Sequence, residues 1–267
     1  MASPDPSPVT YTRYLALDEL LACQRPLGDR HDEMLFVVMH QTMELWLKQI
    51  AHEVAMAQGL IRAGDLEPAY KSLARVSRIQ AVMTLSWDVL ATMTPADYMS
   101  FRDLLGTSSG FQSWQFRRLE YMLGLKDPAF LRFHEAGSGA RIALEEALAA
   151  PTLYDDALGR LTAAGLTSPQ DMAGRDMAAT YAPSKTVEDA WLAVYRDTER
   201  YWDLYELAEK LVDLDDALLA WRQKHVLTVE RIIGRKRGTG GTEGVAYLTR
   251  TLERRCFPEL WSVRTRL

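Results

Sequence analysis

The sequence predicts an all-α protein, a single-domain helical bundle. Apolar residues recur in steps of three, four or eight along several stretches, which is the spacing of one helical face. No stretch shows the β-branched alternation typical of a strand, and no segment repeats at a fixed period. The 267 residues are 48% apolar and 25% charged, which suits a large globular domain with an ample core.

Composition and charge argue against several classes of protein. The formal net charge of −5 disfavours a nucleic-acid partner, because phosphate binding needs a basic field. Cys23 and Cys256 lie far apart and form no CxxC pair, so we expect neither a zinc site nor a disulfide scaffold. No apolar run reaches the roughly 20 residues that span a bilayer. We therefore expect a cytoplasmic protein with no membrane partner.

The first residues differ in character from the rest of the chain. Residues 1–10 are small, polar and rich in proline, and they lack the charged start and apolar core of a signal peptide. We expect 1–10 to be a flexible tail and 11–267 to be a single helical domain.

Three long helices are expected in the first half of the domain. The spacing predicts a central helix over 33–62, a second over 66–93 and a third over 111–124. Between the second and third, Thr94 suits the N-cap of a short helix and Pro95 its first position.

The second half has a looser pattern before it becomes helical again. Residues 126–190 are interrupted by glycine and proline, with short helices predicted at 140–149 and 153–163. A fourth long helix is predicted over 187–208. The C-terminal segment is predicted as one more helix that stops at Pro258.

One histidine lies on an apolar helical face near the C-terminus. In the helix predicted from Leu211, His225 comes four residues after Trp221 and four before Val229. A buried imidazole needs a partner, because leaving a polar group unpaired costs about 1–3 kcal/mol. That partner could be a carbonyl, a carboxylate or a metal, and a satisfied core histidine is the plainest interpretation.

A second histidine has a similar setting. His40 follows Phe36 by four residues on the predicted central helix, so both lie on one side of it. One histidine could ligate haem iron while the other contacts a ligand across the ring, and the absence of CxxCH favours non-covalent haem. A zinc or di-iron site is the rival, but its Glu-x-x-His spacing is absent.

Other residues could bind a small anionic ligand. Arg102 follows Tyr98 by four residues and suits a carboxylate, although an ion pair with Asp97 or Asp103 is equally compatible. The loop around Thr239 is rich in glycine, so its backbone could approach a ligand closely. It lacks the ending of a phosphate-binding loop and follows no strand.

Four long motifs together resemble one family. These are YTRYLALDELL (11–21), HDEMLFVVMHQTMELWLKQIAHE (31–53), DYMSFRDLLGTSSGFQSWQFRRLEYMLG (97–124) and WRQKHVLTVERIIGRKRGTGGTEGVAYL (221–248). In this order they resemble the tryptophan 2,3-dioxygenase family. The resemblance implies an all-helical homotetramer, a dimer of dimers, with haem b and O2 as co-substrate. It implies cleavage of the indole C2–C3 bond of L-tryptophan to give N-formylkynurenine.

The same resemblance implies roles for residues around the haem. His225 in WRQKHVLTV would be the proximal iron ligand, and His40 in FVVMHQT would be the distal, catalytic histidine facing the indole N–H. Phe36 would pack on the indole ring. Ser109 and Trp87 would lie beside the haem.

Further roles concern the amino-acid end of the substrate. Tyr98 and Arg102 in DYMSFRD would bind the carboxylate, and Thr239 in RGTGG would meet the ammonium and carboxylate groups as its loop closes. Tyr11 and Tyr14 would enter the pocket of a neighbouring subunit. From their spacing alone, these two tyrosines could equally cover an apolar surface.

The sequence departs from the family pattern beside both histidines. Met39 stands where glutamine is usual, and Val226 and Leu227 replace a version that contains arginine. A monooxygenase of the same superfamily, converting a substituted tryptophan such as β-methyltryptophan to a 2-oxindole, is therefore the main alternative. A haem sensor or carrier without turnover is the other alternative, and it would not need Arg102, Tyr98 and Thr239 together.

Overall fold

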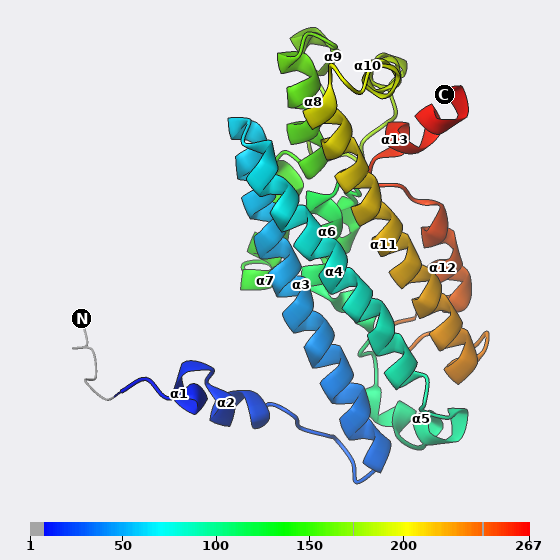
Figure 1. Cartoon of the computed structure of the whole chain (residues 1–267). Coiled ribbons are helices and arrows are strands. Elements are labelled where there is room, and N and C mark those ends of the chain that lie inside the picture. The colour runs from blue at the N-terminus through cyan, green and yellow to red at the C-terminus, as the bar shows by residue number, and fades with distance from the viewer. Residues whose placement is uncertain (1–7, 173, 242) are drawn as a thin grey trace.

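The computed structural model describes residues 8–172, 174–241 and 243–267, and within these ranges the chain forms helices and turns without a strand. Its frame is three long helices, α3 (His31–Ala63), α4 (Leu66–Leu90) and α11 (Trp202–Ile233). They lie side by side, with α4 packed against both others (Figure 1). The all-α prediction is confirmed.

The α3–α4 hairpin follows from local sequence. Each helix repeats apolar residues on one face, and the two faces meet in the core. The turn between them depends on Gly64, whose φ of +88° is in the left-handed region that side chains disfavour. The buried face of α3 includes Met43, Leu47, Ile50, Val54 and Ile61.

A continuous apolar core links this frame to the rest of the chain. It includes Leu158 of α8 (Leu153–Ala163), Trp191 of α10 (Lys185–Arg196) and the C-terminal Leu260. In the part of the chain that the structure describes, no helix is both long and apolar enough to cross a membrane.

The short helix α5 (Pro95–Phe101) begins as predicted. Thr94 accepts a hydrogen bond from the backbone N–H of Asp97, and the Asp97 carboxylate accepts one from the backbone N–H of Thr94 at 2.9 Å. This reciprocal cap fixes the entry to α5 and positions Tyr98 on its buried side.

The segment after α5 is less regular than predicted. It contains the 3₁₀ turns η1 (Arg102–Leu105) and η2 (Gly110–Gln112), and only then α6 (Trp114–Met122). The helix predicted from Phe111 starts later because the Ser113 side chain accepts a hydrogen bond from the N–H of Phe116, at 3.1 Å, and so caps α6.

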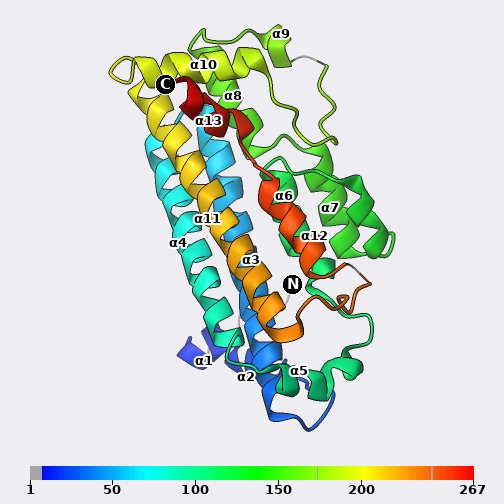
Figure 2. The same cartoon turned by 90° about the vertical axis from the view of Figure 1, so that its right-hand side faces the viewer.

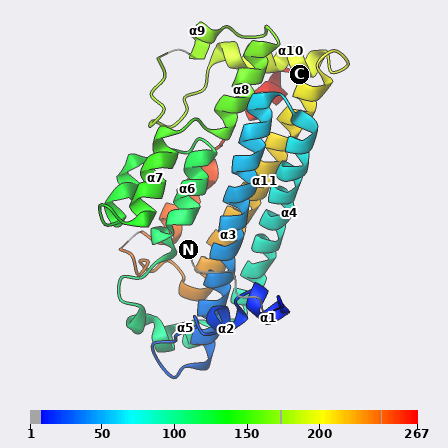
Figure 3. The same cartoon turned by 90° about the vertical axis from the view of Figure 1, so that its left-hand side faces the viewer.

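The loosely patterned region covers one side and one end of the bundle. Figures 2 and 3 show α6 and α7 beside the bundle, α8 alongside the end of α3, and α10 across that end. The helices predicted at 140–149 and 153–163 are confirmed. The elements are η3 (Pro128–Phe133), α7 (Gly139–Ala149), α8, α9 (Pro169–Met172) and α10.

The helix predicted over 187–208 is wrong as a single element. The chain leaves the helix after α10 and enters α11 only at Trp202. Asp197 leaves helical geometry, with φ of −137° and ψ of 63°, and its carboxylate accepts a hydrogen bond from the N–H of Arg200 at 3.3 Å. Asp side chains compete with the helix by bonding to nearby backbone N–H groups, and here the helix ends. The apolar periodicity continues on both sides of this turn, and for that reason the two helices were predicted as one.

The interpretation of Pro258 as a helix stop is also wrong. The C-terminal segment holds α12 (Val245–Arg250), η4 (Thr251–Glu253), α13 (Pro258–Ser262) and η5 (Val263–Arg266). Pro258 is the first residue of α13, a position where its missing N–H costs nothing.

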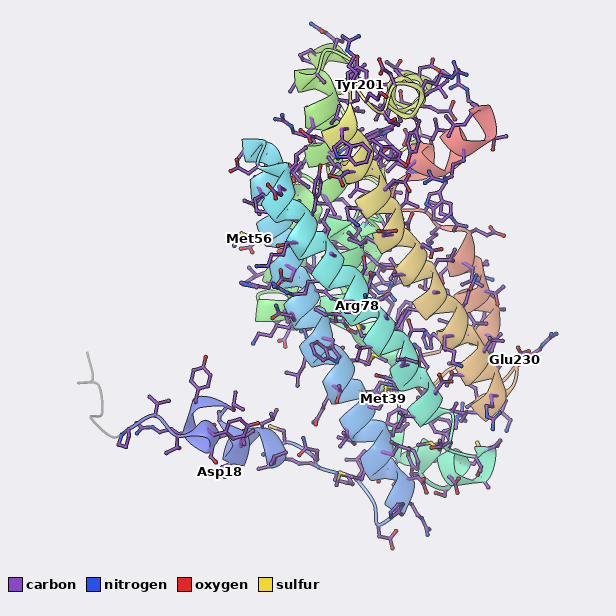
Figure 4. All side chains as sticks on the ribbon, in the orientation of Figure 1. Asp18, Met39, Met56, Arg78, Tyr201 and Glu230 are labelled. Carbon is purple, nitrogen blue, oxygen red and sulfur yellow. The ribbon has the colours of Figure 1, made fainter. Side chains whose placement is uncertain are left out.

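The N-terminal helices form an arm that extends away from the bundle. The arm contains α1 (Tyr11–Tyr14) and α2 (Leu17–Leu21), and Figure 4 shows Asp18 on it, apart from the three long helices. Gln41 of α3 ties its base through a 3.0 Å hydrogen bond to the Cys23 carbonyl. Of the predicted tail, residues 1–7 lie outside the described residues, and Thr10 caps α1.

Candidate active site

A largely apolar cavity of about 640 Å³ lies between α3, α4 and α11, at the end of the bundle that carries α5. Elements far apart in the sequence contribute to its wall, including the loop before α6 and the glycine-rich loop after α11. Most of the predicted site residues line it: Phe36, His40, Trp87, Tyr98, Ser109, His225 and Thr239.

His225 projects from α11 into the wall of this cavity. Burial, together with a smaller effect of nearby His40 and Arg117, lowers the pKa of His225 to about 3. Its ring stacks on Trp87 with centroids 4.4 Å apart and planes at 6°. Among the described residues no side chain or carbonyl hydrogen-bonds to this imidazole, so neutral ring nitrogens are available at the cavity.

His40 has a defined tautomer. Its Nδ1 lies 2.7 Å from the Phe36 carbonyl oxygen, one turn earlier on α3. A carbonyl can only accept, so Nδ1 carries the proton and Nε2 is left as an acceptor. Burial lowers the pKa of His40, which keeps the ring neutral. The ring can therefore accept a hydrogen bond from a ligand N–H in the cavity.

An aromatic wall adjoins His40. The Phe36 ring lies 4.1 Å from the His40 ring, 6.0 Å from that of Tyr98 and 5.7 Å from that of Phe101, measured between centroids. The planes are tilted or edge-on, so the wall is a packed aromatic surface. Such a surface suits a flat aromatic ligand.

Arg102 lies at the rim of the cavity and does not line it. Its Nη2 donates to the Arg237 carbonyl at 2.9 Å, and its Nε is buried without an acceptor among the described residues. Neither Asp97 nor Asp103 pairs with it in this part of the chain. Burial raises the pKa of Tyr98, and the adjacent Arg102 guanidinium partly opposes this. Tyr98 and Arg102 therefore lie together, as the predicted carboxylate site requires.

Two loops meet over the cavity. The Thr239 hydroxyl donates to the Ser108 carbonyl at 2.5 Å. Next to it, Gly240 approaches Ser109 so closely that a Cβ on Gly240 would be 2.8 Å from the Ser109 Cβ. The close approach expected from the glycine-rich sequence is thus made to a second loop.

Tyr11 and Tyr14 do not reach the cavity of their own chain. Both are 76% exposed, on the arm. Within one chain, the predicted site residues of the bundle therefore lie at or beside the cavity, whereas Tyr11 and Tyr14 lie away from it.

Sequence reasoning missed a buried charge cluster in the cavity wall. Glu120 accepts a hydrogen bond from Arg222 at 2.7 Å and pairs with Arg117, whose guanidinium lies 4.0 Å from the centre of the Phe130 ring. The available signal was weak: charged residues stand on otherwise apolar helical faces, with Arg117 and Glu120 three apart.

The departures from the family pattern lie off the cavity. Met39 and Val226 are buried in the protein, Leu227 is exposed, and none of the three lines the wall. They therefore leave the set of cavity residues intact.

The donor set of the cavity suits a flat prosthetic group held by one histidine. His225 offers a neutral nitrogen beside apolar walls, and the buried indole N–H groups of Trp87 and Trp221 and the hydroxyl of Thr228 have no partner among the described residues. The described residues contain no group of three or more His, Cys, Asp or Glu side chains arranged to hold a metal ion. A haem held by one histidine would fit this wall better than a metal held by several side chains.

The fold is all-helical, and its cavity is lined by two histidines and an aromatic wall. These features are typical of a helical bundle that binds a ligand. Within that class, the family model for tryptophan 2,3-dioxygenase matches residues 3–139 and 150–267, so the chain belongs to the tryptophan 2,3-dioxygenase family. The chain is similar to proteins named tryptophan 2,3-dioxygenase from three bacteria. It is 69% identical to that of Caulobacter vibrioides, over 97% of this chain and 98% of the relative. It is 52% identical to those of Bacillus thuringiensis subsp. konkukian and Bordetella parapertussis, over 97% of this chain and 93% and 91% of the relatives.

Proposed function

We propose that the chain is a haem-dependent dioxygenase that adds both atoms of O2 across C2–C3 of L-tryptophan and releases N-formylkynurenine. The proposal rests on one observation above all: His40 and His225, from helices far apart in sequence, line the same cavity. Membership of the family and 69% identity to a protein named tryptophan 2,3-dioxygenase support it.

His225 would hold the iron of haem b. Only a neutral imidazole can ligate a metal, and the lowered pKa of His225 keeps it in that form at physiological pH. When bound, ferrous haem supplies the capacity to bind and activate O2. Trp87 and Ser109, which line the same cavity, would contact the porphyrin.

His40 would orient the indole. Its Nε2 is the acceptor left by the bond from Nδ1 to the Phe36 carbonyl, and an indole N–H can only donate. With Phe36 packed on the indole face, one hydrogen bond and one apolar contact would fix the ring plane. Orientation of this kind accelerates a reaction by making it effectively unimolecular.

Arg102, Tyr98 and Thr239 would hold the amino-acid end. A guanidinium fork matches a carboxylate in geometry and charge, and the phenol of Tyr98 adds a donor beside it. Arg102 would exchange the Arg237 carbonyl for the substrate carboxylate, and Thr239 would turn toward the ammonium group. With the substrate bound to side chains of both loops, the loops would exclude water from the reacting atoms.

The protein would act as a homotetramer, a dimer of dimers. The rings of Tyr11 and Tyr14 are exposed on an arm that extends away from the bundle, and a neighbouring subunit could cover them at its own cavity. Within each subunit, residues 11–267 would form one haem-binding domain. Two free thiols, Cys23 and Cys256, suit a reducing cytoplasm.

The test is to reduce the haem-loaded protein without oxygen, add L-tryptophan and then admit ¹⁸O-labelled O2. We expect N-formylkynurenine that carries two labelled oxygen atoms. An oxindole with one labelled atom would identify a monooxygenase instead. Unchanged tryptophan would leave only the sensor or carrier alternative.

A further inference from the structure

The imidazole of His225 lies within a cluster of three rings. Trp87, from α4, is parallel to it at 4.4 Å and 6°. Trp221, one turn earlier on α11, lies 5.3 Å away and is tilted by 47°. The two indoles contact each other at 5.4 Å. His225 is thus enclosed by one parallel ring and one tilted ring.

No carboxylate or carbonyl among the described residues orients the His225 imidazole. A metal-binding histidine ordinarily donates its second N–H to a carboxylate, a backbone carbonyl or water. The carboxylates of the cavity wall are committed elsewhere: Glu33 accepts from the N–H groups of Leu27 and Gly28, Glu44 from Gln115, and Glu120 from the two arginines. No carbonyl within the described residues accepts from His225 either.

The rings themselves can set the orientation. Turning the imidazole about its Cβ–Cγ bond would drive one edge into the parallel Trp87 ring, so the contact resists rotation. The Nε1–H groups of Trp87 and Trp221 are buried without an acceptor in the described part of the chain. What the two indoles offer to His225 is ring contact, parallel from Trp87 and tilted from Trp221.

We infer that Trp87 and Trp221 are positioning residues that clamp the His225 imidazole by ring contact, in place of a hydrogen-bonded carboxylate. The inference rests on the proposed role of His225 as the haem ligand. A carboxylate partner makes an axial imidazole more basic and a stronger electron donor to iron. Ring contact fixes the orientation without that effect, so the ferrous state that binds O2 is favoured.

The first test is the iron–histidine stretching band of the ferrous holoprotein, measured by resonance Raman spectroscopy. Trp87→Phe keeps a flat face and should keep the band. Trp87→Leu should broaden or split the band and speed haem release about tenfold. Leu90→Ala, a change in the same helix and the same cavity wall without a ring on His225, is the matched control and should leave the band unchanged. Trp221→Leu tests the tilted ring by the same measurement.

The second test replaces the His225 side chain by free imidazole, which has no covalent link to the chain. In His225→Gly protein, added imidazole should restore the ligand, and its affinity should fall about three- to tenfold when Trp87→Leu is also present. Leu90→Ala should not change that affinity. Wild-type bands in both leucine variants, or an unchanged imidazole affinity, would overturn the clamp alone. A wild-type protein that takes up no haem, or a His225→Gly protein that keeps the band, would instead remove the proposed function and the clamp with it.

Discussion

The Thr239 hydroxyl donates a hydrogen bond to the Ser108 carbonyl across 2.5 Å and thereby joins two loops that are 131 residues apart in sequence. Arg102 makes a second link of this kind, to the Arg237 carbonyl. Both side chains are also those proposed to bind the amino-acid end of the substrate. The same two side-chain donors would therefore serve loop closure and ligand binding. A ligand must compete for them with the Ser108 and Arg237 carbonyls.

Thr239→Ala is expected to loosen the glycine-rich loop. A hydrogen bond contributes about 0.5–1.5 kcal/mol, so loss of the proposed bond from Thr239 to the substrate should raise KM for L-tryptophan about two- to tenfold. Amide hydrogen exchange over residues 235–241 should become faster. Thr249→Ala is the control, because that hydroxyl bonds within its own helix, to the Val245 carbonyl. Unchanged exchange would show that the link does not hold the loop, and an unchanged KM would show that Thr239 does not bind the substrate.

Gly244→Ala is expected to distort the base of the same loop. Gly244 has φ of +61°, and a Cβ there would lie 2.4 Å from the Lys236 carbonyl oxygen. The strain should cost about 1–3 kcal/mol, measured by urea unfolding, and should weaken L-tryptophan binding. Gly137→Ala shares the positive φ, +80°, but meets open space. Equal effects of the two variants on binding would contradict the contact with Lys236.

Arg102→Ala should weaken L-tryptophan binding by about 2 kcal/mol. This is the lower end of the range for the loss of one partner of a buried charge pair, because Arg102 is only half-buried. Arg102→Lys should recover only part of the affinity, since an ammonium lacks the fork geometry. Tryptamine, which has no carboxylate, is the matched ligand, and its dissociation constant should hardly change. An equal loss for both ligands would remove Arg102 from the carboxylate site.

Asp156 should make stability fall as pH rises from about 4 to about 6. Burial raises the pKa of Asp156 to about 6, although Arg62 at 3.0 Å acts in the opposite direction. A folded-state pKa above the unfolded value of about 4 means that the native protein binds the proton more tightly, so this contribution is complete below pH 4 and lost through pH 6.

Asp156→Asn should flatten that part of the pH profile, by about 1–3 kcal/mol between pH 4 and 7, in urea unfolding followed by circular dichroism. Asp213→Asn, at an exposed carboxylate 3.4 Å from Lys210, should leave the profile as it is. A wild-type profile for Asp156→Asn would show that this carboxyl titrates normally.

Local signals in the sequence predicted much of the fold. Apolar periodicity located the long helices, and Thr94 with Pro95 marked the start of α5. The wrong predictions of helix boundaries came from residue types that are found in more than one structural context. Pro258 can follow a helix or begin one, and Asp197 stands between two periodic segments that read as one helix.

The sequence by itself determined where α3 and α4 form, which of their faces are apolar, and that His40 and His225 stand on apolar helical faces, because these properties depend on residues within a few turns. Only the tertiary structure decided that Trp87 stacks on His225, that Glu120 joins Arg117 to Arg222, and that the Arg102 guanidinium reaches the Arg237 carbonyl. Those contacts join segments far apart along the chain. Their geometry depends on how helices pack, which periodicity within one helix does not contain.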